Sequence, residues 1–206
     1  NEEECKQQTS SASPIGVGLR RYKDLNGDGK VDAANDREIL GDANPKFFGG
    51  LTNTFAYKGF ELNVFLQYSY GNKILNYNAM ELENPTGGQN AYADMVNRWT
   101  PENPSNIYPK ATTNRALLVS DRFIEDGSYL KLKTFSLSYS FPKINLKHIQ
   151  GLRLYVTGQN LLTWTKYRGY DPEVSYRGAS TLEAGEDFGG YPQSRTFMFG
   201  IKLDIK

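Results

Sequence analysis

The sequence contains almost no cysteine or histidine. Cys5 and His148 are the single examples of these residue types in a chain of 206 residues. One cysteine excludes an intrachain disulfide and a multi-cysteine zinc site, and one histidine leaves little for metal binding or acid–base catalysis. No Ser-His-Asp set, carboxylate pair or glycine-rich phosphate loop occurs in a suitable context. The sequence therefore does not predict an enzyme.

An excess of one charge and a long apolar run are also missing. The 24 Lys and Arg residues balance the 23 Asp and Glu residues, which excludes electrostatic attraction to nucleic acid or anionic lipid as the main activity. No run approaches the roughly 18 apolar residues of a transmembrane helix. The chain begins without Met and without the basic and apolar regions of a signal peptide, so we expect a processed or excised piece of a longer protein.

Aromatic residues and glycine, in contrast, are frequent. The chain has 14 Tyr, 11 Phe and 20 Gly, although its mean hydropathy is −0.60. Disordered chains are poor in aromatic residues, and the abundance of glycine and proline argues against a helical bundle. A folded chain rich in β-strands is therefore expected.

Apolar and polar residues alternate with a two-residue period, which is the pattern of a half-buried β-strand. The alternation predicts about five strands, in residues 51–57, 60–70, 123–141, 152–163 and 197–205. Lys58-Gly59 fits a tight hairpin turn, and residues 142–151 form the other short connection. The long connections are 71–120, with a short helix expected over 91–99, and 166–194.

The length of the strands bears on their environment. Strands of 10 or more residues exceed the about 5–6 residues of typical soluble strands and match the roughly 9–11 tilted residues that cross a bilayer. Short turns, long loops and aromatic residues near strand ends are typical of outer-membrane barrels, but a soluble β-sandwich alternates in the same way. Five strands cannot close a membrane barrel, because the smallest have about 8. A membrane-spanning chain must therefore be completed by other strands.

Seven short motifs follow one another along the chain. They are residues 22–32 (YKDLNGDGKVD), 44–50 (NPKFFGG), 57–60 (YKGF), 125–133 (EDGSYLKLK), 157–161 (TGQNL), 167–173 (YRGYDPE) and 191–196 (YPQSRT). In this order they resemble the C-terminal portion of SusC/RagA-like TonB-dependent outer-membrane transporters. The resemblance covers nearly everything after residue 21.

The resemblance implies an all-β fold, an antiparallel transmembrane β-barrel segment with long extracellular loops. The chain would supply about five C-terminal strands of a barrel of about 22 strands. It also implies an N-terminal plug, a SusD-like surface lipoprotein that acts as a lid, and uptake of glycans or peptides driven by the TonB complex. The expected partners are the remaining strands and plug, the lipoprotein, outer-membrane lipid, and TonB through the missing N-terminal part. The chain departs from the family in ending with Ile205-Lys206, where such barrels often end with an aromatic residue.

The same resemblance predicts a location and a topology. The location is the outer membrane of a Gram-negative bacterium, with residues 1–47 as an extracellular loop and 48–206 as the C-terminal strands. A periplasmic C-terminus places the two short turns in the periplasm and the segments 1–47, 71–120 and 166–194 outside the cell. The alternative function is that of a soluble calcium-dependent carbohydrate-binding β-domain.

A segment near the N-terminus is similar to a calcium-binding loop. Its candidate ligands are Asp24, Asn26, Asp28, Lys30 through its carbonyl, Asp32 and Asp36. The first three occupy alternate positions, and Gly29 permits the sharp turn that lets their oxygen atoms converge. Asn35 stands where a bidentate Glu is usual, so a metal-free turn stabilised by Asp and Asn side chains is the alternative. A bound Ca²⁺ would be structural.

Aromatic residues in or beside the long connections are candidates for substrate or partner contact. They are Trp99, Trp164, Tyr167, Tyr170, Tyr176 and Tyr191. Their rings could stack on sugars or contact peptides, and they could equally belong to an interfacial aromatic girdle or touch the lid.

Overall fold

The computed structural model describes residues 2–84, 90–113, 118–142, 148–173, 176 and 184–205. Part of the predicted 142–151 turn and part of the predicted 166–194 loop lie outside the described residues. The chain forms two compact units. The first comprises residues 1–41, 75–124 and 187–189, and the second comprises 42–74, 125–186 and 190–206.

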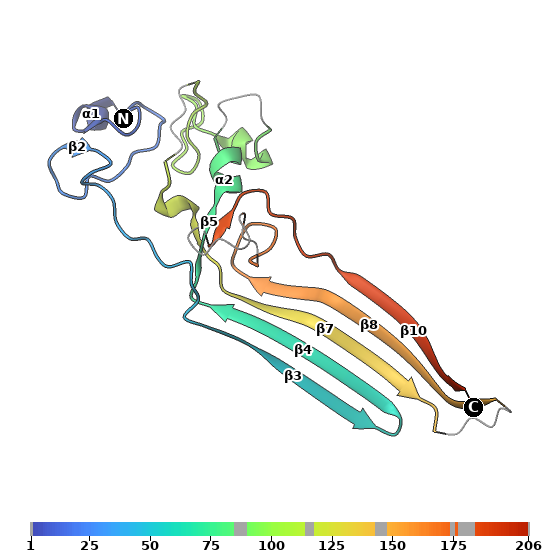
Figure 1. Cartoon of the computed structure of the whole chain (residues 1–206). Coiled ribbons are helices and arrows are strands. Elements are labelled where there is room, and N and C mark those ends of the chain that lie inside the picture. The colour runs from blue at the N-terminus through green and yellow to red at the C-terminus, as the bar shows by residue number, and fades with distance from the viewer. Residues whose placement is uncertain are drawn as a thin grey trace. The chain divides into compact units, whose positions relative to one another are not determined.

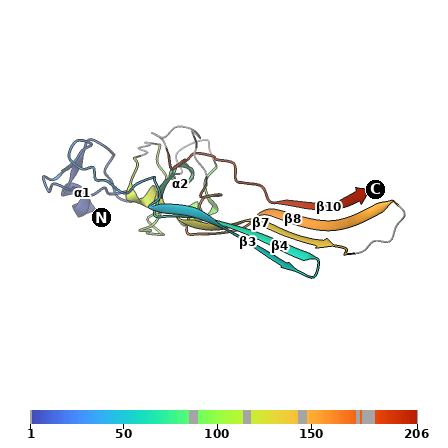
Figure 2. The same cartoon turned by 60° about the horizontal axis from the view of Figure 1, so that its bottom comes forward.

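The second unit contains a five-stranded antiparallel sheet (Figure 1). Its strands are β3 (Phe47–Tyr57), β4 (Phe60–Tyr70), β7 (Tyr129–Ser140), β8 (Ile149–Thr165) and β10 (Thr196–Ile205). Their order across the sheet is β10-β8-β7-β4-β3, and a second view shows the strands side by side along their length (Figure 2). The predicted all-β fold with long antiparallel strands is confirmed.

A tight turn joins β3 to β4. Lys58 and Gly59 both have positive φ, 45° and 87°, as a type I′ hairpin turn requires. A Cβ atom added at Gly59 would lie 2.6 Å from the carbonyl oxygen of Ser140, so this position also needs glycine for space. The predicted hairpin is confirmed.

The register of the strands gives the sheet one apolar face and one polar face, because directly opposite residues share a face. One row of opposite residues crosses the whole sheet as Phe55, Leu62, Leu137, Val156 and Phe199. The adjacent row crosses as Thr54, Asn63, Ser136, Thr157 and Met198. We call the side of the first row the apolar face and the side of the second row the polar face.

Two irregularities in the ladder lie beside Lys133. The register shifts between Phe65 and Leu66 in the β4–β7 pair, and across Lys133 in the β7–β8 pair. Because each shift inserts an extra residue, the apolar positions of β7 change from Leu132 and its even-numbered neighbours to Phe135 and the odd-numbered residues after it. Asn160, at the same place in β8, has a φ of 52°.

The remaining elements are short. The first unit contains α1 (Glu2–Lys6), β1 (Thr9–Ser10) paired in parallel with β2 (Lys30–Val31), α2 (Tyr77–Leu82) and the 3₁₀ turns η1 (Ala93–Asn97) and η2 (Asp121–Phe123). Strands β5 (Lys73–Asn76), β6 (Ile124–Asp126) and β9 (Glu186–Asp187) form a small sheet in the order β6-β5-β9. The structure thus places a helical turn within the predicted 91–99 helix. It also adds α1 in a segment predicted to be a loop.

The only buried hydrophobic cluster among the described residues lies in the first unit. Ala79, Met80 and Phe123 form it, and Leu75 and Tyr77 pack against it. Within the same described part of the chain, no helix combines the length and apolarity needed to span a membrane.

Candidate functional site

The apolar face of the sheet is exposed. Phe55 is 60% exposed, Phe199 81% and Ile201 68%. A soluble β-sandwich would bury such a face against a second sheet, whereas in this chain these side chains remain uncovered. A continuous exposed apolar surface of this kind marks contact with a partner or with lipid.

Aromatic side chains gather at both ends of the apolar face. At one end Phe47 stacks on Tyr70 with ring centroids 4.9 Å apart. At the other end Tyr139 lies 4.5 Å from Phe60 and 4.8 Å from Phe141. Aromatic belts at the two ends of an apolar face are the pattern of a barrel wall that crosses a bilayer.

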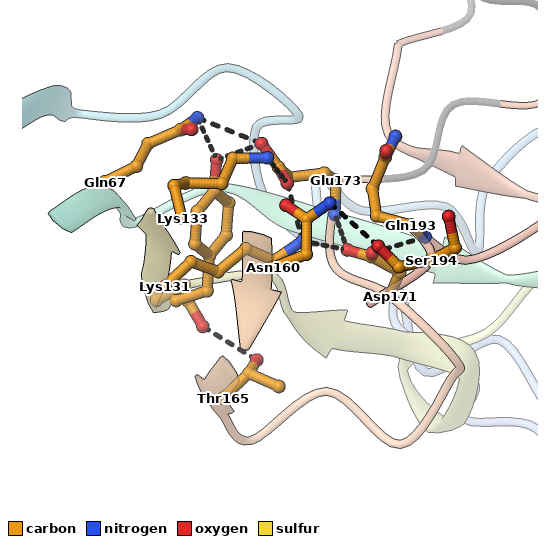
Figure 3. A network of polar contacts seen from close by, with 11 residues as sticks. Gln67, Lys131, Lys133, Asn160, Thr165, Asp171, Glu173, Gln193 and Ser194 are labelled. Atoms are coloured by element: carbon orange, nitrogen blue, oxygen red, sulfur yellow. Dashed lines mark hydrogen bonds and ion pairs between the residues drawn. The ribbon is translucent and has the colours of Figure 1, made fainter. Parts of the chain in front are cut away.

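Ion pairs and hydrogen bonds on the polar face join the sheet to the loop after β8 (Figure 3). The ammonium group of Lys131 in β7 donates to Asp171 Oδ1 and to Glu173 Oε2. Lys133 donates to the same Glu173 oxygen at 2.8 Å, and Gln67 in β4 donates to Glu173 Oε1 at 2.9 Å. We call these five residues the Lys131 network.

The Lys131 network also holds the chain that leads into β10. Asp171 Oδ2 accepts a hydrogen bond from the backbone N–H of Gln193 at 3.1 Å. Close by, the side-chain amide of Asn160 donates to the carbonyl oxygen of Ser194 at 3.0 Å. Two stretches of the long connection between β8 and β10 are therefore fixed to the sheet, at the end where β7 begins.

Charge pairing sets the ionisation of the two loop carboxylates. Burial acts to raise the pKa of Asp171, but hydrogen bonds from Lys131 and from the backbone N–H groups of Glu173 and Gln193 hold it below its ordinary value. Burial likewise acts to raise the pKa of Glu173, and hydrogen bonds from Lys131 and Lys133 lower it. Both groups are thus carboxylates at neutral pH. The network can anchor a loop, but it contains no activated nucleophile.

Sequence reasoning missed the Lys131 network. Lys131 is only 1% exposed, although strand alternation assigns it simply to the polar side. The available signal was a pair of cations in one strand, Lys131 and Lys133, and a pair of anions in Asp171-Pro-Glu173. Both pairs lie inside the motifs that carry the family resemblance.

The predicted calcium loop forms a series of turns closed by side chains. Asp24 accepts from the backbone N–H groups of Gly27 and Gly29, each at 2.7 Å. Asp36 accepts from Leu25 and Asp32, also at 2.7 Å. The side chains of the remaining candidates also accept hydrogen bonds from backbone N–H groups. Asn26 accepts from the N–H of Asp28, and Asp28 accepts from the N–H of Lys30. Asp32 accepts from the N–H groups of Ala34 and Asn35.

The chemistry of these ligands fits Ca²⁺, because the metal prefers carboxylate, amide and carbonyl oxygens. Each carboxylate oxygen that accepts one N–H retains a second lone pair. The ammonium group of Lys30 already lies 3.4 Å from Asp32 Oδ2. Among the described residues, no three His, Cys, Asp or Glu side chains are gathered to hold a metal.

The structure separates the aromatic candidates into two groups. The Tyr167 side chain is 5% exposed, and its ring lies against Gly169. The Trp99 ring lies against Gly18, where a Cβ would come within 2.5 Å of it. The others are open to contact, since Tyr170 is 79% exposed and Tyr191 90%. Tyr176 and Trp164 are also exposed, the latter on the apolar face.

An exposed apolar face, two aromatic belts and a polar opposite face define a wall segment of a membrane β-barrel. Comparison with known proteins identifies which kind. No family model matches the chain, but it is 42% identical to TonB-dependent receptor P3 of Formosa agariphila, over 88% of this chain and 18% of that protein. It is 28% identical to TonB-dependent receptor SusC of Bacteroides thetaiotaomicron, over 89% of this chain and 17% of SusC.

Solved structures agree with these relatives. The RagAB peptide transporter superimposes with a TM-score of 0.71 at 28% identity, over 85% of this chain and 19% of the matched chain. The chain spans about a fifth of the length of the relatives it matches. The chain belongs to the SusC/RagA-like TonB-dependent transporters, as the motifs predicted, and supplies part of the β-barrel.

Proposed function

We propose that this chain forms part of the barrel wall of an outer-membrane nutrient importer in a Gram-negative bacterium. The observation that carries the proposal is the two-sided sheet. Its exposed apolar face suits lipid, and its polar face suits the lumen of a transporter. The 42% identity to a TonB-dependent receptor supports energy coupling through the TonB complex.

The substrate class that we propose is glycans or peptides, delivered with a SusD-like surface lipoprotein as lid. The similarity to SusC and to the RagAB peptide importer supports both parts of this proposal. Uptake of labelled oligosaccharides and peptides is measured in cells that produce the intact transporter, with and without TonB. We expect uptake only in cells that contain both the transporter and TonB. Uptake that stays the same when either one is removed would contradict the proposal.

We further propose that the lipoprotein contacts the long connections. In 71–120, the backbone N–H of Trp99 bonds to the carbonyl of Tyr108 at 3.1 Å, so a deletion of residues 101–106 removes a loop whose ends already meet. The deletion should reduce the lipoprotein that co-purifies with the transporter and leave barrel insertion intact. Unchanged co-purification would assign the contact elsewhere.

The exposed tyrosines Tyr170, Tyr176 and Tyr191 are the proposed contact residues for substrate or lipoprotein. Their exposure, 79%, 50% and 90%, makes these tyrosines accessible to a sugar or a peptide, on which aromatic rings can stack. Combined alanine substitution should weaken substrate or lipoprotein binding, whereas Tyr57→Ala, at an exposed tyrosine beside the short β3–β4 turn, should not.

The loop from Asp24 to Asp36 is a proposed structural Ca²⁺ site. Oxygen atoms of Asp24, Asn26 and Asp28 would lie about 2.3–2.6 Å from one ion. Calorimetry on the intact transporter should show Ca²⁺ binding that Asp28→Ala abolishes. Asp42→Ala is the matched control, because Asp42 makes the same kind of turn with Asn44 outside the loop. Absence of binding to the unsubstituted protein would establish the metal-free turn.

A further inference from the structure

Arg20 in the first unit carries donors that no described residue satisfies. Its Nε and Nη2 atoms are both buried, and neither has a hydrogen-bond partner in the described part of the chain. These two nitrogens form one edge of the guanidinium, and that edge pairs with a carboxylate through two parallel hydrogen bonds. Because leaving such donors unpaired costs free energy, their state calls for an explanation.

The surroundings of Arg20 carry more positive than negative charge. Glu83, only 1% exposed, accepts a hydrogen bond from Arg122 Nε at 2.7 Å. Arg20 Nη2 lies 3.9 Å from the same oxygen, which is too long for a hydrogen bond. Two guanidinium groups therefore share one buried carboxylate oxygen.

The guanidinium of Arg20 is held in place by its neighbours. Its Cζ atom lies 4.9 Å from the ring centroid of Phe123, and the Tyr22 hydroxyl also interacts with it. A donor edge that is fixed before the ligand arrives loses little entropy on binding.

A cavity of about 40 Å³ lies beside Arg20. Its polar lining includes Ser13, Arg20, Tyr22, Asn84, Lys110 and Thr112, and none of the described lining residues is acidic. Lys110 thus adds a second cation. One water needs about 10–15 Å³ of a volume measured in this way, so the cavity has room for about three waters. A carboxylate group fits that space while the rest of a ligand stays outside.

We propose that this cavity binds the carboxylate group of an acidic substrate, either a uronic acid or the C-terminus of a peptide. The donor edge without hydrogen-bond partners, the excess of cations and the small polar cavity all favour a carboxylate over a neutral group. The inference deepens the proposed function and rests on it only for the statement that the ligand is an import substrate.

The test compares acids with their neutral counterparts on the intact transporter purified in detergent. Calorimetry measures galacturonate against galactose, and N-acetyl-alanyl-alanine against its C-terminal amide. At least one acid should bind 10-fold or more tightly than its counterpart, and the pair that shows the difference identifies the source of the carboxylate. Equal affinity within both pairs would overturn the proposal.

Variants locate the binding. Arg20→Met should weaken binding of the acid about 10-fold or more, and Lys110→Met about threefold or more. Arg21→Met is the matched control. Arg21 donates to Gln8 at 3.0 Å and does not line this cavity, so its loss should leave the affinity unchanged.

The remaining outcomes are also decisive. If Arg20→Met fails to fold, Lys110→Met still decides, since unchanged affinity in a folded Lys110→Met protein would overturn the site. A loss in Arg21→Met as large as in Arg20→Met would do the same. Binding is measured without uptake, so a transporter that binds the acid but imports nothing would contradict the proposed function and leave this inference standing.

Discussion

At the scale of the residue, one buried cation determines the path of the chain around it. The Lys131 side chain is 2% exposed and pairs with Asp171 and Glu173, which are 8% and 18% exposed. A buried charge is tolerated only when it is paired and hydrogen-bonded. The partners are 40 and 42 residues downstream, so this pairing fixes a loop that strand propensity alone would leave undetermined.

Replacing Lys131 should release that loop. Lys131→Met leaves two carboxylates without their main partner, and removing one member of a buried ion pair costs about 3–5 kcal/mol. We expect faster trypsin cleavage after Arg168 in the intact transporter. Lys133→Met is the matched control, because Lys133 is 20% exposed and contacts only Glu173 in this network. Equal cleavage rates for the two variants would contradict the role given to Lys131.

The loop should also respond to acid. The pKa values of Asp171 and Glu173 lie below their ordinary values of 3.8 and 4.5, because Lys131 favours their charged forms against the effect of burial. The stabilisation is therefore complete above those ordinary values and is lost as the pH falls through the lowered ones. Hydrogen exchange of residues 166–173, corrected for its intrinsic pH dependence, should rise below about pH 4. Lys131→Met should remove that transition, and a transition unchanged in the variant would assign it to other groups.

Residue-scale chemistry was only partly predictable from the sequence. The local alternation of Leu130, Lys131 and Leu132 assigns Lys131 to the polar side, but periodicity carries no information on how deeply a polar residue is buried. The loop that buries it, around Asp171, has no period at all. The positive φ of Lys58 and Gly59, in contrast, was predictable, because a two-residue hairpin restricts the backbone so strongly.

At the scale of the element, the alternation of apolar and polar residues predicts the long strands. It does not predict the register shifts beside Lys133. Strands β4 and β10 match their predicted segments almost residue by residue, since each side of the sheet selects one kind of side chain. The shift at Lys133 moves the apolar positions of β7 by one residue, and that change is visible in the sequence only as a break in the pattern. Two-residue strands such as β1 and β2 are too short for any period to appear.

A charged side chain on the apolar face of β10 should destabilise the transporter. Ile201→Arg places a guanidinium among Leu154 and its apolar neighbours, and near the bilayer midplane this costs about 2–4 kcal/mol. Met198→Arg is the matched control, because it makes the same change on the polar face of the same strand. Unfolding of the intact transporter in lipid by guanidinium chloride measures the loss of stability in each variant. A larger loss for Met198→Arg would reverse the assignment of the faces.

At the scale of the whole molecule, the chain has few means of its own to cover its sheet. The described buried hydrophobic cluster lies in the first unit. Within the described residues, both edge strands of the large sheet, β3 and β10, have a neighbour on one side only. Unpaired strand edges in lipid are costly. The sequence predicted this dependence on further strands, because five strands cannot close a membrane barrel. The small elements of the first unit were not predictable, since their stability comes from contacts distant in sequence.

Strand parity makes one last prediction, for the membrane topology. The β3–β4 turn and the C-terminal end of β10 lie at the same end of the sheet (Figure 1), so they must face the same compartment. With a periplasmic C-terminus, a protease site inserted between Lys58 and Gly59 should be protected in intact cells. The same site inserted after Glu102, in the long connection 71–120, should be cleaved once the lipoprotein is removed, because functional loops project from the outer end of a rigid barrel. Permeabilised cells, in which both sites should be cut, control for access. Cleavage at Lys58-Gly59 in intact cells, with the Glu102 site protected, would invert the topology and with it the surface available to the lipoprotein and the substrate.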